Sequence, residues 1–312
     1  MGTLLHIGYH KTGTASLQNF VFPTKAGAGF SLVAGGKRIR PAFVEVNPYE
    51  FDPDAARAGF EPGIREAESR DLVPVLSAER LSGNPHFGGY DSKLIADRLA
   101  AAFPDARVLV AIREQAGMLI SLYKQYVKRG GAASFRQYVA GPPGAGQVPR
   151  FRLDFLEYHR LVAHYQSLFG GENVLVLPYE ILRTRPEAFL DRIGAFVGAP
   201  ASEADLRWKN ASLSALSLSL KRHANRWVVR SAFNPAPPLA VDESNKDLLR
   251  LCDALDARVP DALRSRQERR WRRFAEAEVG GDRYARSNAL TVGLTGLDLR
   301  ALGYTCAPTG TD

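Results

Sequence analysis

Two glycines near the start of the chain have the spacing of a loop that binds phosphate. Gly8 and Gly13 match the pattern G-x-x-x-x-G, and Lys11 lies between them. Glycines at a turn from a strand into a helix let backbone amides point at an anion. A helix that begins near Thr14 would add the positive end of its dipole. The sequence therefore predicts an anion site over residues 8–16.

The residues after Gly13 depart from the pattern of nucleotide kinases and GTPases. In those proteins a lysine follows the second glycine, and the next residue carries a hydroxyl that binds Mg²⁺. Here the two positions hold Thr14 and Ala15, and the lysine lies inside the loop as Lys11. Ala15 cannot bind a metal ion, and no cluster of histidine, cysteine and carboxylate residues has metal-ligand spacing. The loop therefore favours a phosphate group without a metal.

A second candidate anion site begins where a short apolar run ends in Arg113. Ser121 follows eight residues later, on the polar side of a predicted helix. An arginine can hold a phosphate through forked, charge-assisted hydrogen bonds. We therefore expect Arg113 and Ser121 to bind one phosphate together. The alternative is an ordinary junction of strand and helix, in which Arg113 pairs with Glu114 or with a surface carboxylate.

Four short apolar runs are predicted to be the strands that position these residues. They lack polar alternation, which is typical of strands buried on both faces. They cover residues 3–9, 72–77, 107–112 and 173–178. Helical patterns cover residues 91–102, 115–129, 186–197, 213–228, 246–258 and about 268–290. The alternation predicts an α/β fold of the P-loop type, with three layers (α/β/α) and a central parallel sheet.

The 312 residues are predicted to form a single domain. The sheet core would occupy about residues 1–200, and a helical portion without strands would occupy about residues 201–312. Prolines after Asn234 indicate a rigid connection inside the domain. The glycine- and proline-rich residues 141–146 predict a mobile loop, of the kind that often borders an acceptor site.

The composition is that of a globular protein with an excess of positive charge. The net charge of +8 favours anionic partners. The two cysteines, Cys252 and Cys306, have neither metal-ligand nor disulfide spacing, which fits a reducing compartment. The N-terminus does not resemble a signal peptide, and no apolar run reaches the roughly 18 residues of a membrane helix. We therefore expect a cytoplasmic protein without a membrane anchor.

Together the two candidate anion sites resemble the donor-binding motifs of bacterial-type sulfotransferases. Lys11-Thr-Gly-Thr-x-Ser-Leu resembles their 5′-phosphosulfate loop, and Arg113 with Ser121 has the spacing of their 3′-phosphate pair. The family usually has Asp-Pro after the arginine, where this chain has Glu114-Gln115. Residues 174–198, with Tyr179, resemble the strand–Tyr-Glu-x-Leu–helix unit of the family. The resemblance runs from about residue 4 to residue 304.

The resemblance implies an enzyme that transfers a sulfuryl group by in-line displacement. The donor would be 3′-phosphoadenosine 5′-phosphosulfate, and the acceptor a hydroxyl or amine of a small molecule, a lipid or a carbohydrate. Lys11 would stabilise charge on the leaving group, and Tyr179 would lie against the adenine ring. A polar segment with Asn210, Ser212 and Asn225 resembles one that closes near the nucleotide. The 5′-phosphate would be held by backbone amides of Thr12, Gly13, Thr14, Ala15 and Ser16, with the hydroxyls of Thr14 and Ser16.

The reaction needs a base, because an acceptor hydroxyl is a weak nucleophile until it loses its proton. Glu79 follows the predicted strand over 72–77, at the sheet edge where open α/β folds place their sites. Several sulfotransferases have a glutamate or histidine base near this place. We therefore expect Glu79 to be the base, with His10 as the second candidate and His86 as a third. A salt bridge between Glu79 and Arg80 is the structural alternative.

Two other functional classes remain open from the sequence. A P-loop nucleotide kinase would need Mg²⁺, which Ala15 disfavours, whereas a non-catalytic adenosine-nucleotide-binding protein would bind without turnover. Residues 264–273 contain six arginines around Trp271. Such runs are usually solvated helix faces, and an acidic acceptor such as a charged glycan is the alternative. Nucleic acid is not expected as a partner, because no nucleic-acid-binding motif is present.

Overall fold

The contacts within the chain define two compact units. The computed structural model describes residues 2–23, 29–140, 151–199, 213–239, 241–242 and 246–306. The first unit, here called the sheet unit, comprises Met1–Glu114, Asp154–Trp208 and Asp282–Asp312. The second, here called the helical unit, comprises Gln115–Leu153 and Lys209–Gly281. The prediction of a single domain stays a prediction.

The sheet unit is built on five parallel strands. They are β1 (Leu4–His6), β2 (Phe30–Gly35), β3 (Val73–Ser77), β4 (Arg107–Ile112) and β5 (Val174–Pro178). Their order in the sheet is β2-β3-β1-β4-β5, and every neighbouring pair is parallel. Parallel neighbours need crossover connections, which helices supply. The predicted α/β class with a central parallel sheet is confirmed.

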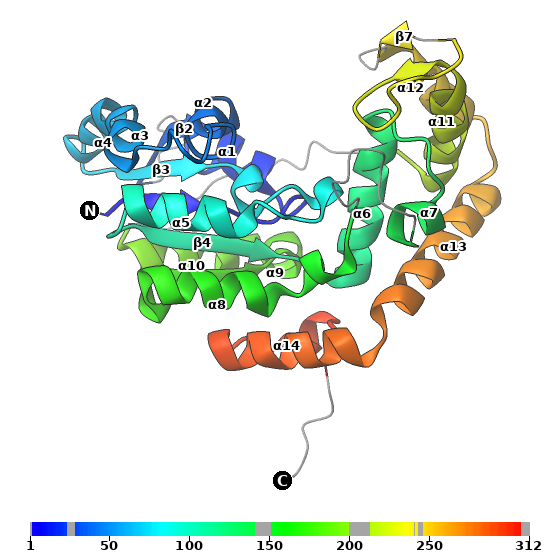
Figure 1. Cartoon of the computed structure of the whole chain (residues 1–312). Coiled ribbons are helices and arrows are strands. Elements are labelled where there is room, and N and C mark those ends of the chain that lie inside the picture. The colour runs from blue at the N-terminus through cyan, green and yellow to red at the C-terminus, as the bar shows by residue number, and fades with distance from the viewer. Residues whose placement is uncertain are drawn as a thin grey trace. The chain divides into compact units, whose positions relative to one another are not determined.

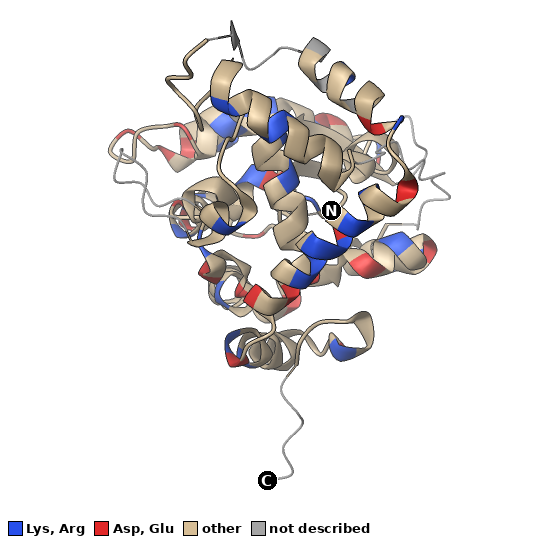
Figure 2. Cartoon of the chain, turned by 90° about the vertical axis from the view of Figure 1, so that its right-hand side faces the viewer, with Lys and Arg blue, Asp and Glu red and all other residues tan. Residues whose placement is uncertain are grey.

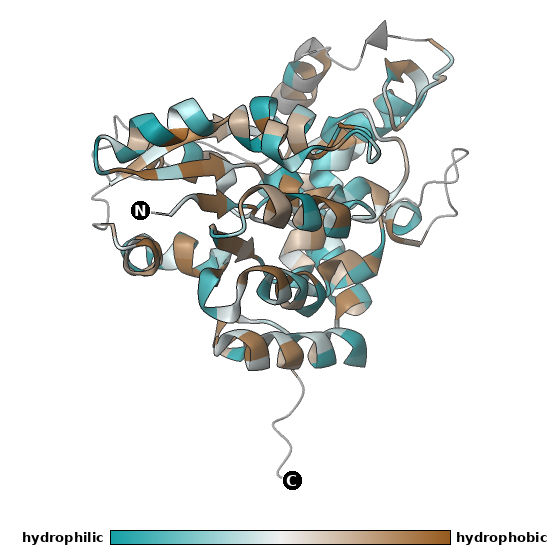
Figure 3. Ribbon diagram, turned by 60° about the vertical axis from the view of Figure 1, so that its left-hand side comes forward, coloured by the Kyte–Doolittle hydropathy of each residue, from teal (hydrophilic) through white to brown (hydrophobic). Residues whose placement is uncertain are grey.

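Helices cover both faces of this sheet (Figure 1). On one face, Leu4, Val75 and Leu109 pack in a buried cluster with α1 (Thr14–Phe20), α9 (Tyr179–Thr184) and α10 (Pro186–Val197). On the other face, α8 (Tyr158–Phe169) contacts β4 and β5 and packs against α5 (Ser92–Ala102). Hydrophobic residues dominate the strands, whereas the helices carry both kinds of residue (Figure 3). The three predicted layers are therefore present.

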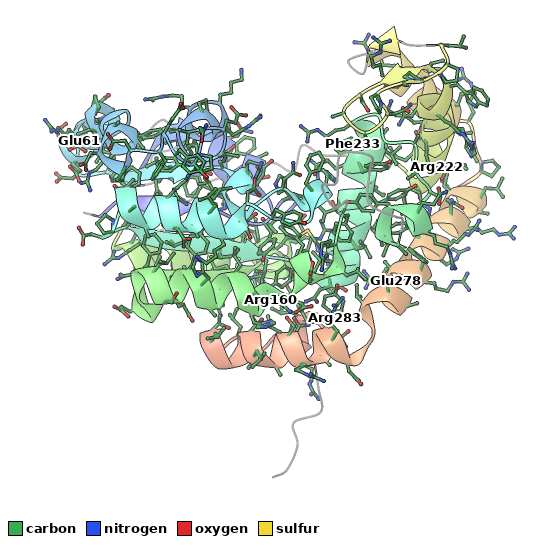
Figure 4. All side chains as sticks on the ribbon, in the orientation of Figure 1. Glu61, Arg160, Arg222, Phe233, Glu278 and Arg283 are labelled. Atoms are coloured by element: carbon green, nitrogen blue, oxygen red, sulfur yellow. The ribbon has the colours of Figure 1, made fainter. Side chains whose placement is uncertain are left out.

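Further helices complete the sheet unit beside this core. They are α2 (Gly36–Phe43), α3 (Pro53–Ala58), α4 (Glu61–Glu68) and α14 (Asp282–Thr295). Helix α14 packs on α8, where the buried carboxylate of Glu157 lies between Arg160 and Arg283 at 2.7 and 2.9 Å (Figure 4). Short 3₁₀ helices lie at Glu79–Ser82 (η2), Pro85–Phe87 (η3), Leu153–Leu156 (η4), Gly171–Asn173 (η5) and Arg300–Leu302 (η6).

The helical unit contains five helices within its described residues. They are α6 (Gln115–Lys128), α7 (Phe135–Ala140), α11 (Ala215–Val228), α12 (Lys246–Asp256) and α13 (Asp261–Val279). Its core contains the buried Trp271, whose ring centroid lies 4.9 Å from that of Tyr123 and 5.7 Å from that of Phe135. Aromatic pairs at these distances add to the stability that burial provides. Trp271 is therefore a packing residue of this unit.

The strand predictions need two corrections. Strand β2 was not predicted; it is an edge strand of half-buried residues with a register shift between Leu32 and Ala34, so it lacks a continuous apolar run. The helical portion was predicted to have no strand, but β6 (Val229–Arg230) and β7 (Val241–Asp242) form a parallel pair. Two residues per strand are too few to produce a periodic pattern.

The single helix predicted over about 268–290 is wrong. The structure has α13 and α14 instead, separated at Gly280 and Gly281. Glycine weakens a helix interior, because it loses more backbone entropy than other residues. The backbone at Gly280 is also close to the preceding turn, since a Cβ there would lie 2.7 Å from the carbonyl oxygen of Glu276. The break assigns α13 to the helical unit and α14 to the sheet unit.

Candidate active site

The loop between β1 and α1 first continues alongside β4 and then turns sharply. The amides of Ile7 and Tyr9 donate to the carbonyls of Leu109 and Ala111 at 3.0 and 2.9 Å. The backbone then takes left-handed φ values, 68° at Lys11 and 91° at Gly13. Left-handed residues in such a turn let successive amides converge on an anion. The loop lies at the carboxyl end of the sheet, the usual place of a ligand in an open α/β fold.

Both glycines of the loop are required by their surroundings. A Cβ at Gly8 would lie 2.9 Å from Nε2 of His6 and 3.2 Å from Oγ1 of Thr12. A Cβ at Gly13 would lie 2.6 Å from Cδ2 of Leu182, and the left-handed backbone there is itself unfavourable for other residues. The sequence pattern that identified the loop therefore has two causes. At Gly8 the neighbouring side chains leave no room for a Cβ, and at Gly13 the backbone is left-handed.

Several hydrogen-bond donors of the loop have no acceptor within the described part of the chain. The amide of Ser16 bonds back to the carbonyl of Gly13 at 2.9 Å, but no such acceptor serves the amides of residues 12–15. The hydroxyl of Thr14 is buried and has no partner among the described residues, whereas that of Thr12 donates to the Tyr9 carbonyl at 2.5 Å. Unpaired buried donors cost free energy. An anionic ligand would satisfy these donors.

Lys11 shares the mouth of this loop with two other charged side chains. Partial burial of its ammonium group lowers the pKa of Lys11; the carboxylate of Glu79 opposes this change, and the guanidinium of Arg113 adds to it. Arg113 also donates from Nη1 to the Lys11 carbonyl at 3.2 Å. Lys11, Glu79 and Arg113 are thus brought together, although they follow three different strands. An anion bound here would offset the repulsion between the two cations.

Arg113 is held in place from several directions. Its guanidinium lies over the ring of Tyr179, 4.8 Å from the centroid, and its carbonyl accepts a 2.5 Å hydrogen bond from the Tyr158 hydroxyl. The Tyr179 ring also adjoins Gly13, since a Cβ at that glycine would lie 3.6 Å from it. Arg113 therefore occupies one face of the aromatic ring that was predicted to lie against adenine. The structure brings Arg113 and Tyr179 to the loop.

Glu79 and His10 lie beside each other at the same edge of the sheet. Oε1 of Glu79 lies 4.0 Å from Nδ1 of His10, and Nε2 of His10 lies 3.2 Å from the carbonyl of Gly83. The side chain of Glu79 is 41% exposed, whereas that of His10 is 10% exposed. His86 is buried in η3. Of the three candidate bases, Glu79 is therefore the one that an acceptor from solvent can reach most directly.

The sequence did not identify the contacts that hold the segment after β3. Arg80 pairs with Asp91, and the second carboxylate oxygen of Asp91 accepts from the amide of Asn84 at 3.2 Å. The proposed salt bridge between Glu79 and Arg80 is therefore replaced by the Arg80–Asp91 pair. These partners are eleven residues apart, and no motif marks them. The ion pair joins the segment that carries Glu79 to the start of α5.

A second missed residue is Glu180, which ties β4 to β5 and to the C-terminal part of the sheet unit. Its Oε1 accepts from the amide of Glu114 at 3.0 Å, and its Oε2 accepts from the hydroxyl of Tyr304 at 2.9 Å. The Glu114 amide directly follows Arg113, so this carboxylate positions the end of β4. Its place directly after Tyr179, in the quoted Tyr-Glu unit, was the available signal for it.

Other predicted residues belong to the helical unit or lie outside the described residues. Ser121 belongs to α6 of the helical unit, so its pairing with Arg113 stays a prediction. Asn225 is buried in that unit, where its amide nitrogen donates to the carbonyls of Val127 and Gly131 at 2.8 and 2.9 Å. This gives Asn225 a structural role. Asn210, Ser212 and the loop over 141–146 lie outside the described residues.

The described residues contain no group of three or more histidine, cysteine, aspartate or glutamate side chains that could hold a metal ion. Neither Cys252 nor Cys306 forms a disulfide within the described residues. None of the helices that the structure describes is long and apolar enough to cross a membrane. The candidate site therefore consists of two cations, Lys11 and Arg113, the backbone amides of residues 12–15, and the exposed carboxylate of Glu79.

A comparison with protein families finds a similarity over the middle of the chain. Residues 92–203, about a third of the chain, match the sequence profile of the Sulfotransferase family. The matched segment contains β4, α6 and β5, with Arg113, Ser121 and Tyr179. The match indicates that the protein is a transferase. It supports an assignment of this region to the sulfotransferase family, and sulfuryl transfer as the reaction.

Two solved structures of bacterial sulfotransferases resemble the chain more distantly. The crystal structure of a sulfotransferase from Alicyclobacillus acidocaldarius is 19% identical with a TM-score of 0.46, over 85% of this chain and 99% of that chain. The sulfotransferase domain from the curacin biosynthetic pathway is 12% identical with a TM-score of 0.37, over 90% of this chain and 98% of that one. A search of curated proteins finds no match. The support for a sulfotransferase therefore rests on the family profile over residues 92–203.

Proposed function

We propose that the donor of this sulfotransferase is 3′-phosphoadenosine 5′-phosphosulfate and that the acceptor is a hydroxyl or amine reached from the side of Glu79. The observation that supports this most directly is the loop after β1. Its amides over residues 12–15 and the buried hydroxyl of Thr14 have no acceptor among the described residues, and Lys11 and Arg113 adjoin them. A 5′-phosphosulfate group, which carries one negative charge on phosphate and one on sulfate, suits the amides, the Thr14 hydroxyl and Lys11.

Each side chain of the site has a separate role in the transfer. When bound, the donor supplies the sulfuryl group, which passes directly from the bridging oxygen to the acceptor. Lys11 places its ammonium group where the bridging oxygen gains negative charge, which is electrostatic stabilisation of the transition state. Arg113 and Ser121 hold the 3′-phosphate, and Tyr179 contacts the adenine with the part of its ring that Arg113 leaves open.

Glu79 accepts the proton that the acceptor loses as the new bond to sulfur forms. Its exposed carboxylate and its place at the end of β3 support this role. His10 is too enclosed to meet an acceptor first, and it lies behind Glu79 as the second candidate base. Metal coordination has no part in the proposal, since Ala15 replaces the hydroxyl that would bind Mg²⁺. A cytoplasmic location is consistent with two cysteines that form no disulfide within the described residues.

The donor is tested by calorimetric titration of the full chain with 3′-phosphoadenosine 5′-phosphate and with ATP, each with and without Mg²⁺. We expect the bisphosphate to bind at least about tenfold more tightly than ATP and independently of Mg²⁺. Labelled-sulfate transfer into an acceptor mixture then measures turnover. Preferred binding of ATP with Mg²⁺ would favour the nucleotide kinase, and bisphosphate binding without any turnover would favour a non-catalytic binding protein.

Lys11→Ala tests the central catalytic role. Loss of one preorganised charge from a transition state costs about 10²–10³-fold in kcat, so we expect this loss while binding of the bisphosphate stays measurable. Lys93→Ala is the matched control, because Lys93 is an exposed lysine of the same unit that pairs with Asp97 at 2.6 Å. Turnover of Lys11→Ala equal to that of the control would remove Lys11 from the mechanism.

A further inference from the structure

The excess positive charge of the chain lies entirely in the helical unit. Gln115–Leu153 and Lys209–Gly281 contain 20 lysine and arginine residues against nine aspartate and glutamate residues. The three segments of the sheet unit contain 21 basic residues against 24 acidic residues. The unit that contains the phosphate loop is thus slightly acidic. The basic excess needs an explanation other than the loop.

Four arginines of α13 form an unbroken line on its exposed side. Arg266, Arg269, Arg270 and Arg273 are all exposed, and their spacing of i, i+3, i+4 and i+7 puts them on one face of the helix. They span about 10 Å along the helix axis, at roughly 1.5 Å per residue. Figure 2 shows the basic residues gathered along this helix. We call these four residues the arginine stripe.

The arginines of the stripe form no ion pair with any described residue. Two other arginines of α13 do: Arg264 pairs with Asp261, and Arg272 pairs with Glu276 at 2.6 Å. Inside the stripe, each arginine has another arginine three or four residues away. Like charges at these spacings destabilise a helix. A surface shaped for solubility alone would mix the signs of its charges, so the stripe indicates an anionic partner.

The opposite side of α13 is buried, which holds the stripe outward. Trp271, Ala275 and Val279 are all buried, and Trp271 packs on the rings of Tyr123 and Phe135. The apolar side of the helix therefore cannot enter a bilayer, as the apolar side of a membrane-surface helix does. Phe274, four residues after Arg270, lies beside the stripe, but its ring packs on that of Phe135 with a centroid distance of 4.8 Å, and Arg136 lies over it. The stripe thus offers charge and forked donors, and the aromatic ring beside it is already packed.

We propose that the arginine stripe binds an anionic glycan, carboxylated or sulfated, and that this glycan is the acceptor of the reaction; the second half of this statement rests on the proposed function. Guanidinium groups bind carboxylate and sulfate through two parallel hydrogen bonds. A linear row of them matches a polymer that repeats its charge. Single-stranded nucleic acid relies on stacking against open aromatic rings, and the ring of Phe274 beside the stripe is already packed against Phe135 and Arg136. A glycan also supplies the hydroxyls that sulfuryl transfer needs.

The binding test compares two double variants of the same helix. Arg269→Gln/Arg270→Gln removes the centre of the stripe, and Arg264→Gln/Arg272→Gln removes two arginines that are already paired. With heparin oligosaccharides as the probe at low salt, we expect the first variant to lose at least tenfold in affinity and the second less than twofold. Thermal unfolding of both proteins checks that neither variant has lost its fold. Equal losses in the two variants would overturn the proposal.

Other polyanions identify the class of the partner. Uncharged dextran should not bind, and single-stranded DNA and polyglutamate should bind more weakly than heparin and lose less affinity in Arg269→Gln/Arg270→Gln. Tighter binding of DNA or polyglutamate through the stripe would replace the glycan by that polymer.

The acceptor role has its own readout. In sulfate transfer to a carboxylated polysaccharide, Arg269→Gln/Arg270→Gln should raise KM at least fivefold, with kcat and the affinity for 3′-phosphoadenosine 5′-phosphate unchanged. Unchanged KM would overturn the acceptor role while the glycan site stands. A wild-type chain that binds heparin through the stripe but does not bind the bisphosphate would instead overturn the proposed donor. The two failures are therefore distinguishable.

Discussion

The loop after β1 and the arginine stripe of α13 both present positive charge, but they hold it in opposite ways. In the loop, the guanidinium of Arg113 donates to the carbonyl of Lys11 and lies over Tyr179, and the ammonium of Lys11 is partly buried. On α13, four arginines are exposed and have no ion-pair partner among the described residues. The first arrangement fixes two charges, and the second leaves four free to move.

This difference suggests different ligands for the two regions. Fixed charges stabilise a group at one place, because they need little reorganisation when that group arrives or reacts. Mobile, exposed charges attract any extended anion and are screened by salt. We therefore propose that the loop serves catalysis and that the stripe binds a polymer. Changes in the loop should alter kcat or donor affinity strongly, whereas changes on α13 should alter acceptor binding and leave chemistry untouched.

The largest effect should come from removing Glu79, the proposed base beside the loop. Glu79→Gln keeps the shape of the side chain but cannot accept a proton, so we expect kcat at neutral pH to fall by about 10²-fold or more. Donor affinity should change little, because the carboxylate faces the acceptor. Glu66→Gln, an exposed glutamate of α4 paired with Arg70, is the control and should keep kcat within twofold. Full activity of Glu79→Gln would transfer the role to His10.

The next largest effect should come from changing the backbone of the loop, which tests whether its stability and its ligand binding depend on the left-handed conformation of Gly13. Gly13→Ala adds a Cβ to a residue with φ of 91° and places it 2.6 Å from Leu182. We expect a loss of about 2–4 kcal/mol in the free energy of unfolding, from strain and overpacking together, and at least tenfold weaker binding of the bisphosphate. Urea unfolding and calorimetry measure the two quantities.

Gly198→Ala is the matched control for this change. Gly198 also has a left-handed backbone, with φ of 72°, but a Cβ there would meet nothing within 4 Å. It should therefore lose only about 1 kcal/mol, from backbone strain alone, and bind the bisphosphate normally. If the two alanine variants were equally stable, the contact with Leu182 would have no energetic effect, and the close packing of the loop would not matter for binding.

The same contrast explains what could be predicted from the sequence. Strands buried on both faces leave continuous apolar runs, so β4 at Arg107–Ile112 was predictable to the residue. Strand β2 lies at the sheet edge, half buried and with a bulge between Leu32 and Ala34, and it leaves no such run. Gly280 and Gly281 are a breaker signal that could have divided α13 from α14. The sequence shows that six arginines cluster over residues 264–273. Only the break at Gly280 and Gly281 shows that α13, and not a longer helix, carries them.

In the site, features of the backbone were predictable and side-chain partners were not. The spacing of Gly8 and Gly13 follows from the loop conformation, which is a local property. The hydroxyl of Tyr158, in contrast, reaches the carbonyl of Arg113 across 45 positions in the sequence. Glu180 likewise joins the amide of Glu114 to the hydroxyl of Tyr304. Such contacts depend on how layers pack, and no local spacing encodes them.

A smaller effect should appear in the pH dependence of donor binding. Burial lowers the pKa of Lys11 in the free protein, and a bound phosphate favours the protonated ammonium. As the pH rises through this lowered pKa, Lys11 becomes neutral and the affinity for the bisphosphate should fall, by at most about tenfold per pH unit. Calorimetry between pH 7.5 and 10 measures this fall, over a range in which the phosphates stay ionised.

Lys11→Arg separates this titration from that of other groups, since a guanidinium stays charged to above pH 12 or so. Its affinity should stay level over the range in which the wild-type affinity falls. Parallel curves for the two proteins would show that another group causes the pH dependence. Variants of the arginine stripe should follow the wild-type curve, because they leave the loop intact.

The smallest effect should be on local helix stability, when a paired arginine and an unpaired arginine are removed from two exposed helix surfaces. In Arg65→Gln, α4 loses an ion pair to Glu61 at 3.2 Å, which should cost a few tenths of a kcal/mol. In Arg270→Gln, α13 loses repulsion from Arg266 and Arg273, so its local stability should stay equal or rise by about the same amount. Glutamine and arginine have similar helix propensity, so backbone preference does not confuse the comparison.

Amide hydrogen exchange of each helix, measured against wild type at low and high salt, resolves these local free energies. Exchange in α4 should quicken and exchange in α13 should slow or stay unchanged, and both differences should shrink as salt screens the charges. Quicker exchange of α13 in Arg270→Gln would mean that Arg270 has a stabilising partner in solution. The stripe would then be an ordinary paired surface, its charge would need no anionic ligand, and its contrast with the loop after β1 would disappear.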